Sequence, residues 1–144
     1  MLHLVDSPAG VLTELRRVLR PGGLAVVSQS DYDTLTAGPG SLETNRAVNR
    51  FVSSSILPHA TVARQLPRLA ENAGLTVHTV QTTAPLIRDF PTADTVLGLR
   101  RNASRAVNAG QLDRTEAERW VTELEEGPFL ATFILFRVTL RAPA

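Results

Sequence analysis

The stretch LTELRRVLRPGGLAVVSQSD, residues 12–31, decides the fold. Its first half repeats apolar residues at helical spacing with charged residues between them, which predicts an amphipathic helix. A Pro-Gly-Gly break ends that helix, and the apolar run LAVVS, residues 24–28, follows at once. A short continuous apolar run suits a strand covered on both faces, as in a parallel sheet flanked by helices. The expected inward face of the helix is Val11, Leu12, Leu15, Val18 and Leu19.

Helices and strands are expected to alternate along the whole chain. Ser7 and Pro8 begin the first helix, and residues 29–41 are polar and rich in turn-forming residues. Later helices are expected over residues 42–56, over 63–73 with the regular part from Leu66, from Thr92 to about 107, and after an Asp113/Glu116 capping box. Strands are expected over 75–87 and 129–140. The order predicts an α/β fold with three good strands, built as a single domain from residues 1–144.

Two apolar stripes are expected on the later helices. The helix that begins at Thr92 has its stripe at Val96, Leu97, Ala103 and Val107. Trp120 lies on an apolar face with Ala117, Val121 and Leu124, so it is expected in the core rather than against a ligand.

The composition excludes several classes of function. The net charge is +1, with 15 basic and 14 acidic residues, so nothing favours a nucleic-acid partner. All the basic residues are arginine. No apolar run reaches the ~18 residues of a membrane helix, and the first ten residues lack the basic and apolar regions of a signal peptide. We therefore expect a cytoplasmic protein that binds neither membranes nor nucleic acid.

Several kinds of catalytic site are also excluded. The chain has no cysteine, which removes disulfides, thiolate metal ligands and a cysteine nucleophile. His59 and His78 have no metal-ligand spacing, so no metal site is expected. No G-x-S-x-G elbow is present, which argues against a serine hydrolase.

The block HLVDSPAGVLTELRRVLRPGGLAVVSQSDYDTL, residues 3–35, resembles the middle of class I S-adenosylmethionine-dependent methyltransferases that act on small molecules. In that family a fourth strand ending in a His-Leu-like pair is followed by a D-x-P segment, a helix, P-G-G and a fifth strand. Residues 63–75, ARQLPRLAENAGL, look like the helix before the sixth strand, and residues 129–143 look like the seventh strand. The resemblance implies a partial Rossmann-like sheet with strands equivalent to the fifth, seventh and sixth, flanked by helices.

The cofactor-binding half of that family has no counterpart here. A cofactor loop lies between a strand and a helix, where amides at the helix N-terminus face the ligand. Gly22 and Gly23 instead lie between a helix and a strand. The resemblance thus implies the C-terminal half of a methyltransferase, with residues 1–3 inside a truncated fourth strand, as a mis-set start codon or a truncated gene would leave it. We expect this chain alone to bind S-adenosylmethionine weakly or not at all.

The resemblance also assigns site residues. His3 and Leu4 would lie near the methyl-donor end of the cofactor, and Gln29, Asp31 and Tyr32 would line the substrate side. Arg64 could hold an anionic substrate group, although a solvated arginine at a helix start is the simpler interpretation. Methyl transfer often requires only proximity and orientation. The catalytic residues are therefore left unassigned, with His3 or Asp31 as the base if one is needed.

Other interpretations of the same residues stay open. His3 could be an ordinary polar residue at a strand end, and Asp31 and Asp33 could form a turn. Arg100, Arg101 and Arg105 form a basic helix face that solvation explains. The chain could be a non-catalytic interaction module that pairs through an open strand edge, as a homodimer or with a separate N-terminal half. It could also be a small-ligand-binding module that has lost the cofactor.

Overall fold

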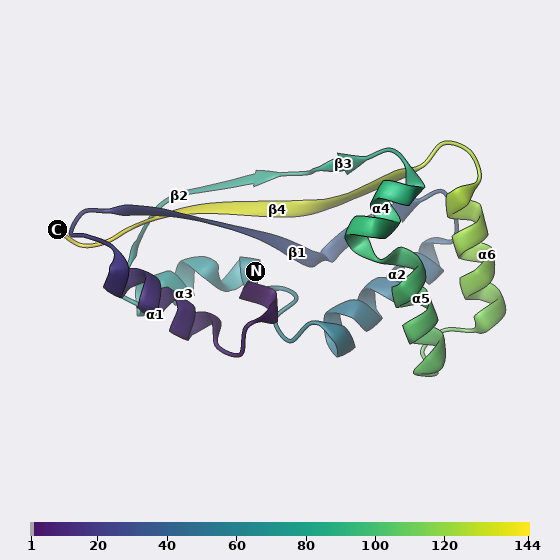
Figure 1. Ribbon diagram of the computed structural model, residues 1–144, viewed down its shortest axis with the longest axis horizontal. Helices are drawn as coiled ribbons and strands as arrows, with labels where there is room; N and C mark the ends of the chain where they lie inside the picture. Colours follow the sequence, from purple (N-terminus) through teal and green to yellow (C-terminus); the bar gives the residue numbers. More distant parts are fainter. Residues whose placement is uncertain (1) are drawn as a thin grey trace.

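The computed structural model describes residues 2–144 and shows a mixed α/β fold (Figure 1). Two 3-10 turns and one π turn, Leu2–Leu4, Val62–Gln65 and Val52–Ile56, join the longer elements. The α/β class expected from the sequence is therefore observed. The helices and strands are α1 (Pro8–Val18), β1 (Leu24–Gly38), α2 (Leu42–Phe51), α3 (Leu66–Asn72), β2 (Thr76–Thr83), β3 (Leu86–Ile87), α4 (Phe90–Leu97), α5 (Leu99–Asn108), α6 (Arg114–Glu125) and β4 (Leu130–Arg141).

The four strands form one sheet in the order β1-β4-β2, and β3 pairs with β4 off this path. Every pairing is antiparallel. Because β1 and β2 both oppose β4, they run parallel to each other on its two sides. The chain crosses from β1 to β2 through α2 and α3, the helical crossover that parallel strands require.

Two separate hydrophobic cores lie toward opposite ends of the long sheet (Figure 1). The α1/α3 core packs these two helices on the same face of the sheet, where Val138 and Leu140 of β4 are fully buried. The α5/α6 core packs α2 and the later helices around Trp120 and Leu124 at the other end. Trp120 is 1% exposed, so its predicted place in the core is confirmed.

Helix boundaries follow the capping residues. Ser7 accepts a hydrogen bond from the Gly10 amide and Pro8 occupies the first turn, as predicted. Asp113 caps α6 by accepting from the Glu116 amide, again as predicted. In the break after α1, Gly22 has a φ of 71°, a left-handed conformation that favours glycine.

The segment predicted as a single helix from Thr92 is two helices. Asp89, not Thr92, is the N-cap, and it accepts a hydrogen bond from the Thr92 amide. Gly98 ends α4 with a left-handed φ of 65°, and α5 begins at the next residue. The turn at Gly98 changes the helix direction, so Val96 is 63% exposed instead of inward.

The strand predicted over residues 24–28 extends to Gly38 instead of ending before the turn-rich segment. The register with β4 shifts between Asp31 and Thr36, which marks an irregularity of the β-bulge type. Turn chemistry is present inside this bulge, because the Asp31 carboxylate accepts from the Asp33 amide. Thr34 bonds both the Asp31 carbonyl and the Ile134 amide of β4, which keeps the strands joined across the irregularity.

Residues 2–4 are a 3-10 turn and not the end of a strand; Met1 lies outside the described residues. The Leu2 amide donates to the side chain of Gln29 rather than to a strand partner.

Two further predictions are wrong in part. Val11 and Val18, expected on the inward face of the first helix, are 40% and 59% exposed, and Val26 at 59% shows that β1 is not covered on both faces. Three element boundaries differ less. The helix expected over 42–56 ends in a π turn, Pro67 lies in the first turn of α3, and the strand expected over 75–87 is interrupted between β2 and β3.

Candidate functional site

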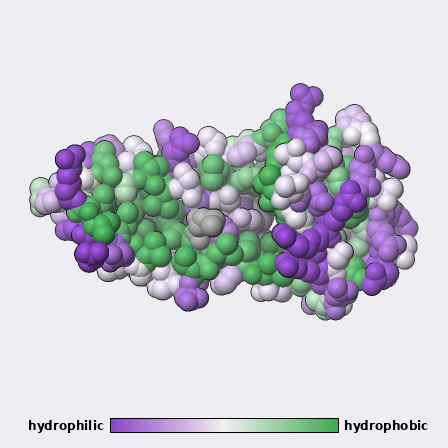
Figure 2. Space-filling model, viewed as in Figure 1, coloured by the Kyte–Doolittle hydropathy of each residue, from purple (hydrophilic) through white to green (hydrophobic). Residues whose placement is uncertain are grey.

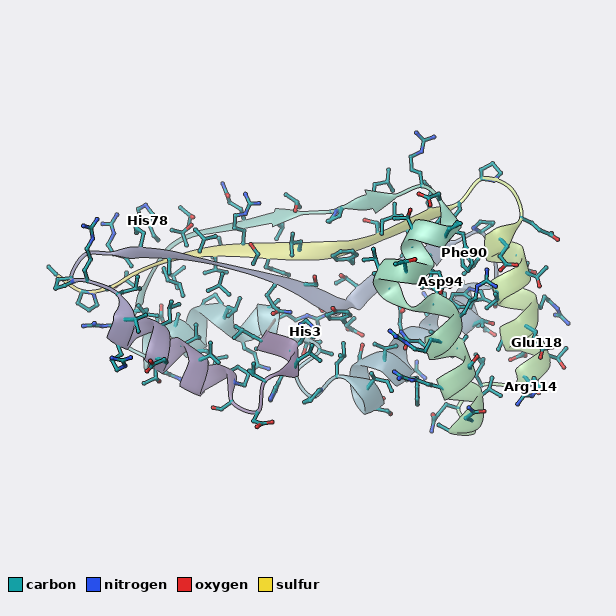
Figure 3. The ribbon with its side chains drawn as sticks, in the orientation of Figure 1. His3, His78, Phe90, Asp94, Arg114 and Glu118 are labelled. Atoms are coloured by element: carbon teal, nitrogen blue, oxygen red, sulfur yellow. The ribbon has the colours of Figure 1, made fainter. Side chains whose placement is uncertain are left out.

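A polar cluster lies between the two cores and joins the 3-10 turn at the start of the chain to β1. It comprises His3, Gln29 and Tyr32, and Figure 3 shows His3 below the middle of β1. His3 and Gln29 are buried, at 8% and 2% exposed, and Tyr32 is half-buried. The rings of His3 and Tyr32 lie 4.7 Å apart, centroid to centroid. The structure therefore brings together three of the predicted site residues.

The hydrogen bonds of Gln29 fix the tautomer of His3. Gln29 Oε1 accepts from the Leu2 amide at 2.9 Å, so its Nε2 faces the Ser30 carbonyl at 3.1 Å and His3 Nδ1 at 2.8 Å. An amide nitrogen donates, so Nδ1 accepts and neutral His3 carries its proton on Nε2. That nitrogen lies 3.3 Å from Tyr32 Oη and donates to it. The hydroxyl proton of Tyr32 is then available to a bound molecule.

Burial keeps both rings in their neutral forms. Desolvation lowers the pKa of His3 from its ordinary value and raises the pKa of Tyr32. His3 is consequently an uncharged imidazole near neutral pH, and Tyr32 is a protonated phenol. The pair can orient a neutral group by hydrogen bonding and has no charge with which to hold an ion.

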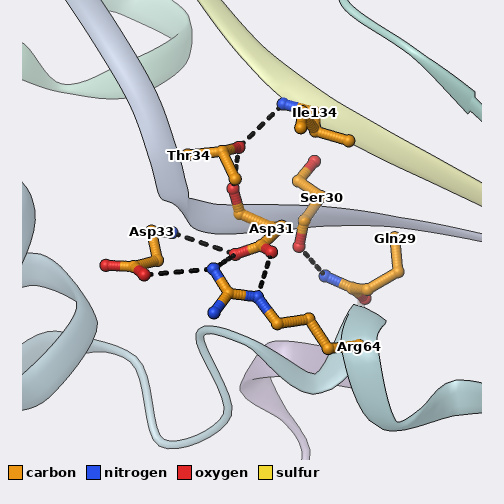
Figure 4. A network of polar contacts seen from close by, with 7 residues as sticks. All are labelled: Gln29, Ser30, Asp31, Asp33, Thr34, Arg64 and Ile134. Atoms are coloured by element: carbon orange, nitrogen blue, oxygen red, sulfur yellow. Dashed lines mark hydrogen bonds and ion pairs between the residues drawn. The ribbon is translucent and has the colours of Figure 1, made fainter.

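A second cluster surrounds Asp31, which lies two residues after Gln29 on the same side of β1 (Figure 4). Asp31 is 1% exposed and its carboxylate pairs with Arg64, whose Nε and Nη2 lie 2.5 and 3.2 Å from the two oxygens. Arg64 Nη2 also bonds Asp33 at 3.0 Å. The two carboxylates raise the pKa of the Arg64 guanidinium. With two partners inside the chain, Arg64 has an internal structural role that neither sequence interpretation anticipated.

Leu4 differs from its neighbour His3, because its side chain is 54% exposed. It belongs to an apolar patch along the outer edge of β1 and the adjoining face of α1. Figure 2 shows hydrophobic residues gathered on this end of the molecule. We call this set the β1-edge patch: Leu4, Val11, Val18, Leu24 and Val26, each at least 40% exposed.

One arginine of the predicted basic face of α5 forms contacts within the chain. Arg100 pairs with Asp94 at 3.2 Å and with Glu125, and its guanidinium lies 4.9 Å from the ring centre of Phe90. Figure 3 labels Phe90 and Asp94 beside one another on α4. Arg100 therefore links α4 and α6, while its side chain stays 54% exposed, as the solvated interpretation expects. Arg101 and Arg105 remain exposed.

An apolar slot opens beside Tyr32 and involves residues that the sequence alone did not indicate. It encloses about 110 Å³ and is lined by Ser30, Tyr32, Leu35, Val96, Leu97 and Phe133. These residues come from β1, the end of α4 and β4, so only the topology brings them together. Val96 was expected inward from its spacing, but here it stands at a pocket.

Within residues 2–144, no group of three His, Asp or Glu side chains lies close enough to hold a metal ion. In the same part of the chain, no helix is both long and apolar enough to cross a bilayer.

Comparison with known proteins finds no matching family model. The chain is 44% identical over 142 residues to an uncharacterized 37.1 kDa protein in transposon Tn4556 of Streptomyces fradiae. That match covers 99% of this chain and 41% of the relative. Among solved structures, the chain is similar to phosphoethanolamine N-methyltransferase 2 of Haemonchus contortus, in complex with phosphomonomethylethanolamine and S-adenosylhomocysteine. The TM-score is 0.42 at 12% identity, over 99% of this chain and 31% of that one.

Proposed function

We propose that the chain is the substrate-side part of a class I S-adenosylmethionine-dependent methyltransferase domain. The observation that carries this proposal is the strand order, β1-β4-β2. The resemblance of residues 3–35 makes β1 the fifth strand, β2 the sixth and β4 the seventh, and it implies the order fifth, seventh, sixth. The two parallel strands joined by a helical crossover are also what a Rossmann-like sheet requires.

The exposed edge of β1 supports the proposal that another part of a sheet completes the domain. In the sheet order, β1 is an edge strand. A groove of about 380 Å³ follows this edge and is lined by apolar residues of α1 and β1, including Leu15 and Val27. Exposed apolar edge strands are sites of pairing with further strands, and the β1-edge patch places five large apolar side chains beside it. The remaining 59% of the Streptomyces relative is long enough to supply such strands.

The two residues assigned to the cofactor, His3 and Leu4, could form only a small part of an S-adenosylmethionine site. Both ring nitrogens of His3 are engaged, by Gln29 and Tyr32. Leu4 is exposed and could pack against an apolar surface of S-adenosylmethionine, but it offers no side-chain polar group. β1 leads into α2 through Gly38-Pro39-Gly40-Ser41, which has two glycines but lacks the third glycine of a G-x-G-x-x-G cofactor loop. We therefore assign this chain the positioning of the methyl acceptor, by Tyr32 and its neighbours, and no step on the cofactor itself.

Titration calorimetry with S-adenosylhomocysteine tests the proposal. We expect no measurable heat of binding with this chain alone and micromolar binding by the 37.1 kDa Streptomyces relative. Failure of the relative to bind would contradict the methyltransferase assignment. Micromolar binding by this chain alone would contradict its role as only part of the domain.

A second candidate function is an interaction module, and the β1-edge patch is the observation that favours it. In that case two copies of the chain would pair edge to edge. Sedimentation velocity tests the module, because it predicts a homodimer that persists at micromolar concentration. A monomer at high concentration would contradict the module.

A further inference from the structure

The slot beside Tyr32 points to a chemical class of methyl acceptor. We propose that it binds a compact uncharged group of the size of one aromatic ring, carrying a hydroxyl that faces Tyr32. This inference rests on the proposed function, and it names the substrate class for the same site.

The size and lining of the slot support a single ring. Its volume of about 110 Å³ approaches that of engineered apolar cavities of roughly 150 Å³, which bind benzene. Leu35, Leu97 and Phe133 provide apolar walls from three different elements. Burial of apolar surface on a ring of this size is the main source of affinity that such walls can offer.

The absence of charge in the lining supports a neutral ligand. None of the six lining residues is ionised at neutral pH. The nearby Asp31 lies next to Ser30 in the strand, and its carboxylate is satisfied by Arg64 and the Asp33 amide. A charged ligand would lose its hydration in the slot and gain no partner, which is costly.

Tyr32 connects the slot to the polar cluster. Its ring lines the slot, and its oxygen accepts from His3. Gln29 holds His3 in the tautomer that leaves the tyrosine hydroxyl as a donor. The phenolic proton of Tyr32 can therefore bond the oxygen of a ligand hydroxyl and orient that oxygen toward the His3 side of the strand. By the resemblance, this is the methyl-donor side.

Core packing does not explain why an apolar residue, Val96, stands at this position. It is 63% exposed on α4 and lines the slot. An apolar side chain in this position shields one wall of a bound ring from water. Substitution of Val96 should therefore change ligand binding without disturbing the core.

The test is a ¹⁹F NMR titration of this chain with 4-fluorophenol, 4-fluorobenzoate and 4-fluorobenzylamine, without cofactor. We expect 4-fluorophenol to bind at least ten-fold more tightly than the two charged rings. Tyr32 is the single tyrosine of the chain, so its ring resonances report binding at this place. Equal affinity for a charged ring, or an unshifted Tyr32 signal, would overturn the proposal.

Two variants locate the site. Val96→Asp should weaken 4-fluorophenol binding at least ten-fold, because it places a carboxylate at the slot. Val80→Asp is the matched control, since Val80 is 48% exposed on β2 and lies outside both the slot and the β1-edge patch. Tyr32→Phe should weaken 4-fluorophenol by roughly three- to ten-fold, the worth of one hydrogen bond, and leave fluorobenzene unchanged. An unchanged affinity in Val96→Asp would contradict the site.

The outcome is independent of the cofactor experiment. Absence of 4-fluorophenol binding together with cofactor binding by the Streptomyces relative would reject the substrate class and keep the methyltransferase. Binding of 4-fluorophenol without cofactor binding by the relative would reject the methyltransferase and keep the ligand site.

Discussion

The two ends of the sheet differ in how completely they are covered. At the α5/α6 end, α2, α4, α5 and α6 surround the core, and Trp120 and Leu124 are at most 1% exposed. At the α1/α3 end, two helices cover one face, and the β1-edge patch stays in contact with water. Both ends bury leucines completely. The two ends therefore differ in the exposed apolar surface around each core and not in the packing of the core itself. A lobe with a packed core and an apolar border is what an interface with further structure requires.

The largest expected effects test whether the two cores are equally consolidated. Leu12 and Leu124 are both 0% exposed, one in each core. We expect Leu12→Ala and Leu124→Ala each to lower the free energy of unfolding by about 3 kcal/mol, from lost burial and the cavity left behind. Urea denaturation followed by circular dichroism measures both.

A loss below about 1 kcal/mol for Leu12→Ala alone would show that α1 does not pack in this chain without further structure, since ordinary core leucines cost more. The two ends would then differ in whether their helices are packed at all, and not in how much apolar surface lies exposed around each core.

The next effect concerns the polar region between the cores. Arg64→Ala leaves the buried Asp31 carboxylate without its guanidinium partner. Because Arg64 itself is half exposed, the expected loss is about 2 kcal/mol, below that of a fully buried pair. Arg64→Lys should restore part of it. Arg68→Ala is the matched control, an exposed arginine one turn further along, and it should change stability by less than about 0.5 kcal/mol.

Much of the fold could be predicted from the sequence because it depends on local signals. The Ser7 and Asp113 caps and the Pro-Gly-Gly break act through neighbouring residues, and all three were correctly interpreted. The continuation of β1 through residues 29–38 depends instead on β4, which lies about a hundred residues away. The turn-forming residues of that segment were correctly seen but are accommodated inside a bulge.

The candidate site likewise has a part that could be predicted from the sequence and a part that could not. His3, Gln29 and Tyr32 were named in advance from the resemblance, and the structure places them in one cluster. The partners of Arg64 and the slot walls could not be predicted, because α3, α4 and β4 come together only through the topology. The two-residue spacing of Asp31 and Asp33 was the one available signal, and it was interpreted as a turn.

A smaller effect is expected from pH at the boundary between the ends. The pKa of His3 is lowered in the folded protein, so below its unfolded value of about 6.5 the unfolded chain binds more protons than the folded one. Stability should therefore fall as the pH decreases from 7.5 to 5.5, and His3 should account for about 1 kcal/mol or less of that fall. Thermal unfolding of the wild type and of His3→Asn at both pH values measures this. An equal pH dependence in the variant would show that His3 is not responsible.

Substitutions on the two edge strands should have the smallest effect on stability, but they compare the two edges of the sheet most directly. Val26 on β1 and Val80 on β2 are exposed valines on opposite edge strands, at 59% and 48%. A lysine at either position should change the free energy of unfolding by less than about 0.5 kcal/mol, because no core contact is lost. Their effects on association should differ. A lysine beside β1 would have to be desolvated when a further strand docks there, whereas β2, with the sequence TVHTVQTT, is mostly polar.

The measurement is association of this chain with the co-expressed remaining segment of the Streptomyces relative, or with itself. Val26→Lys should weaken that association at least ten-fold and Val80→Lys should leave it unchanged, because lysines on an edge strand oppose strand addition. Equal weakening by both variants would mean that general charge and not the β1 edge governs association. Weakening by Val80→Lys alone would place the partner on the opposite edge, and the groove between α1 and β1 would then lose its role as the docking surface.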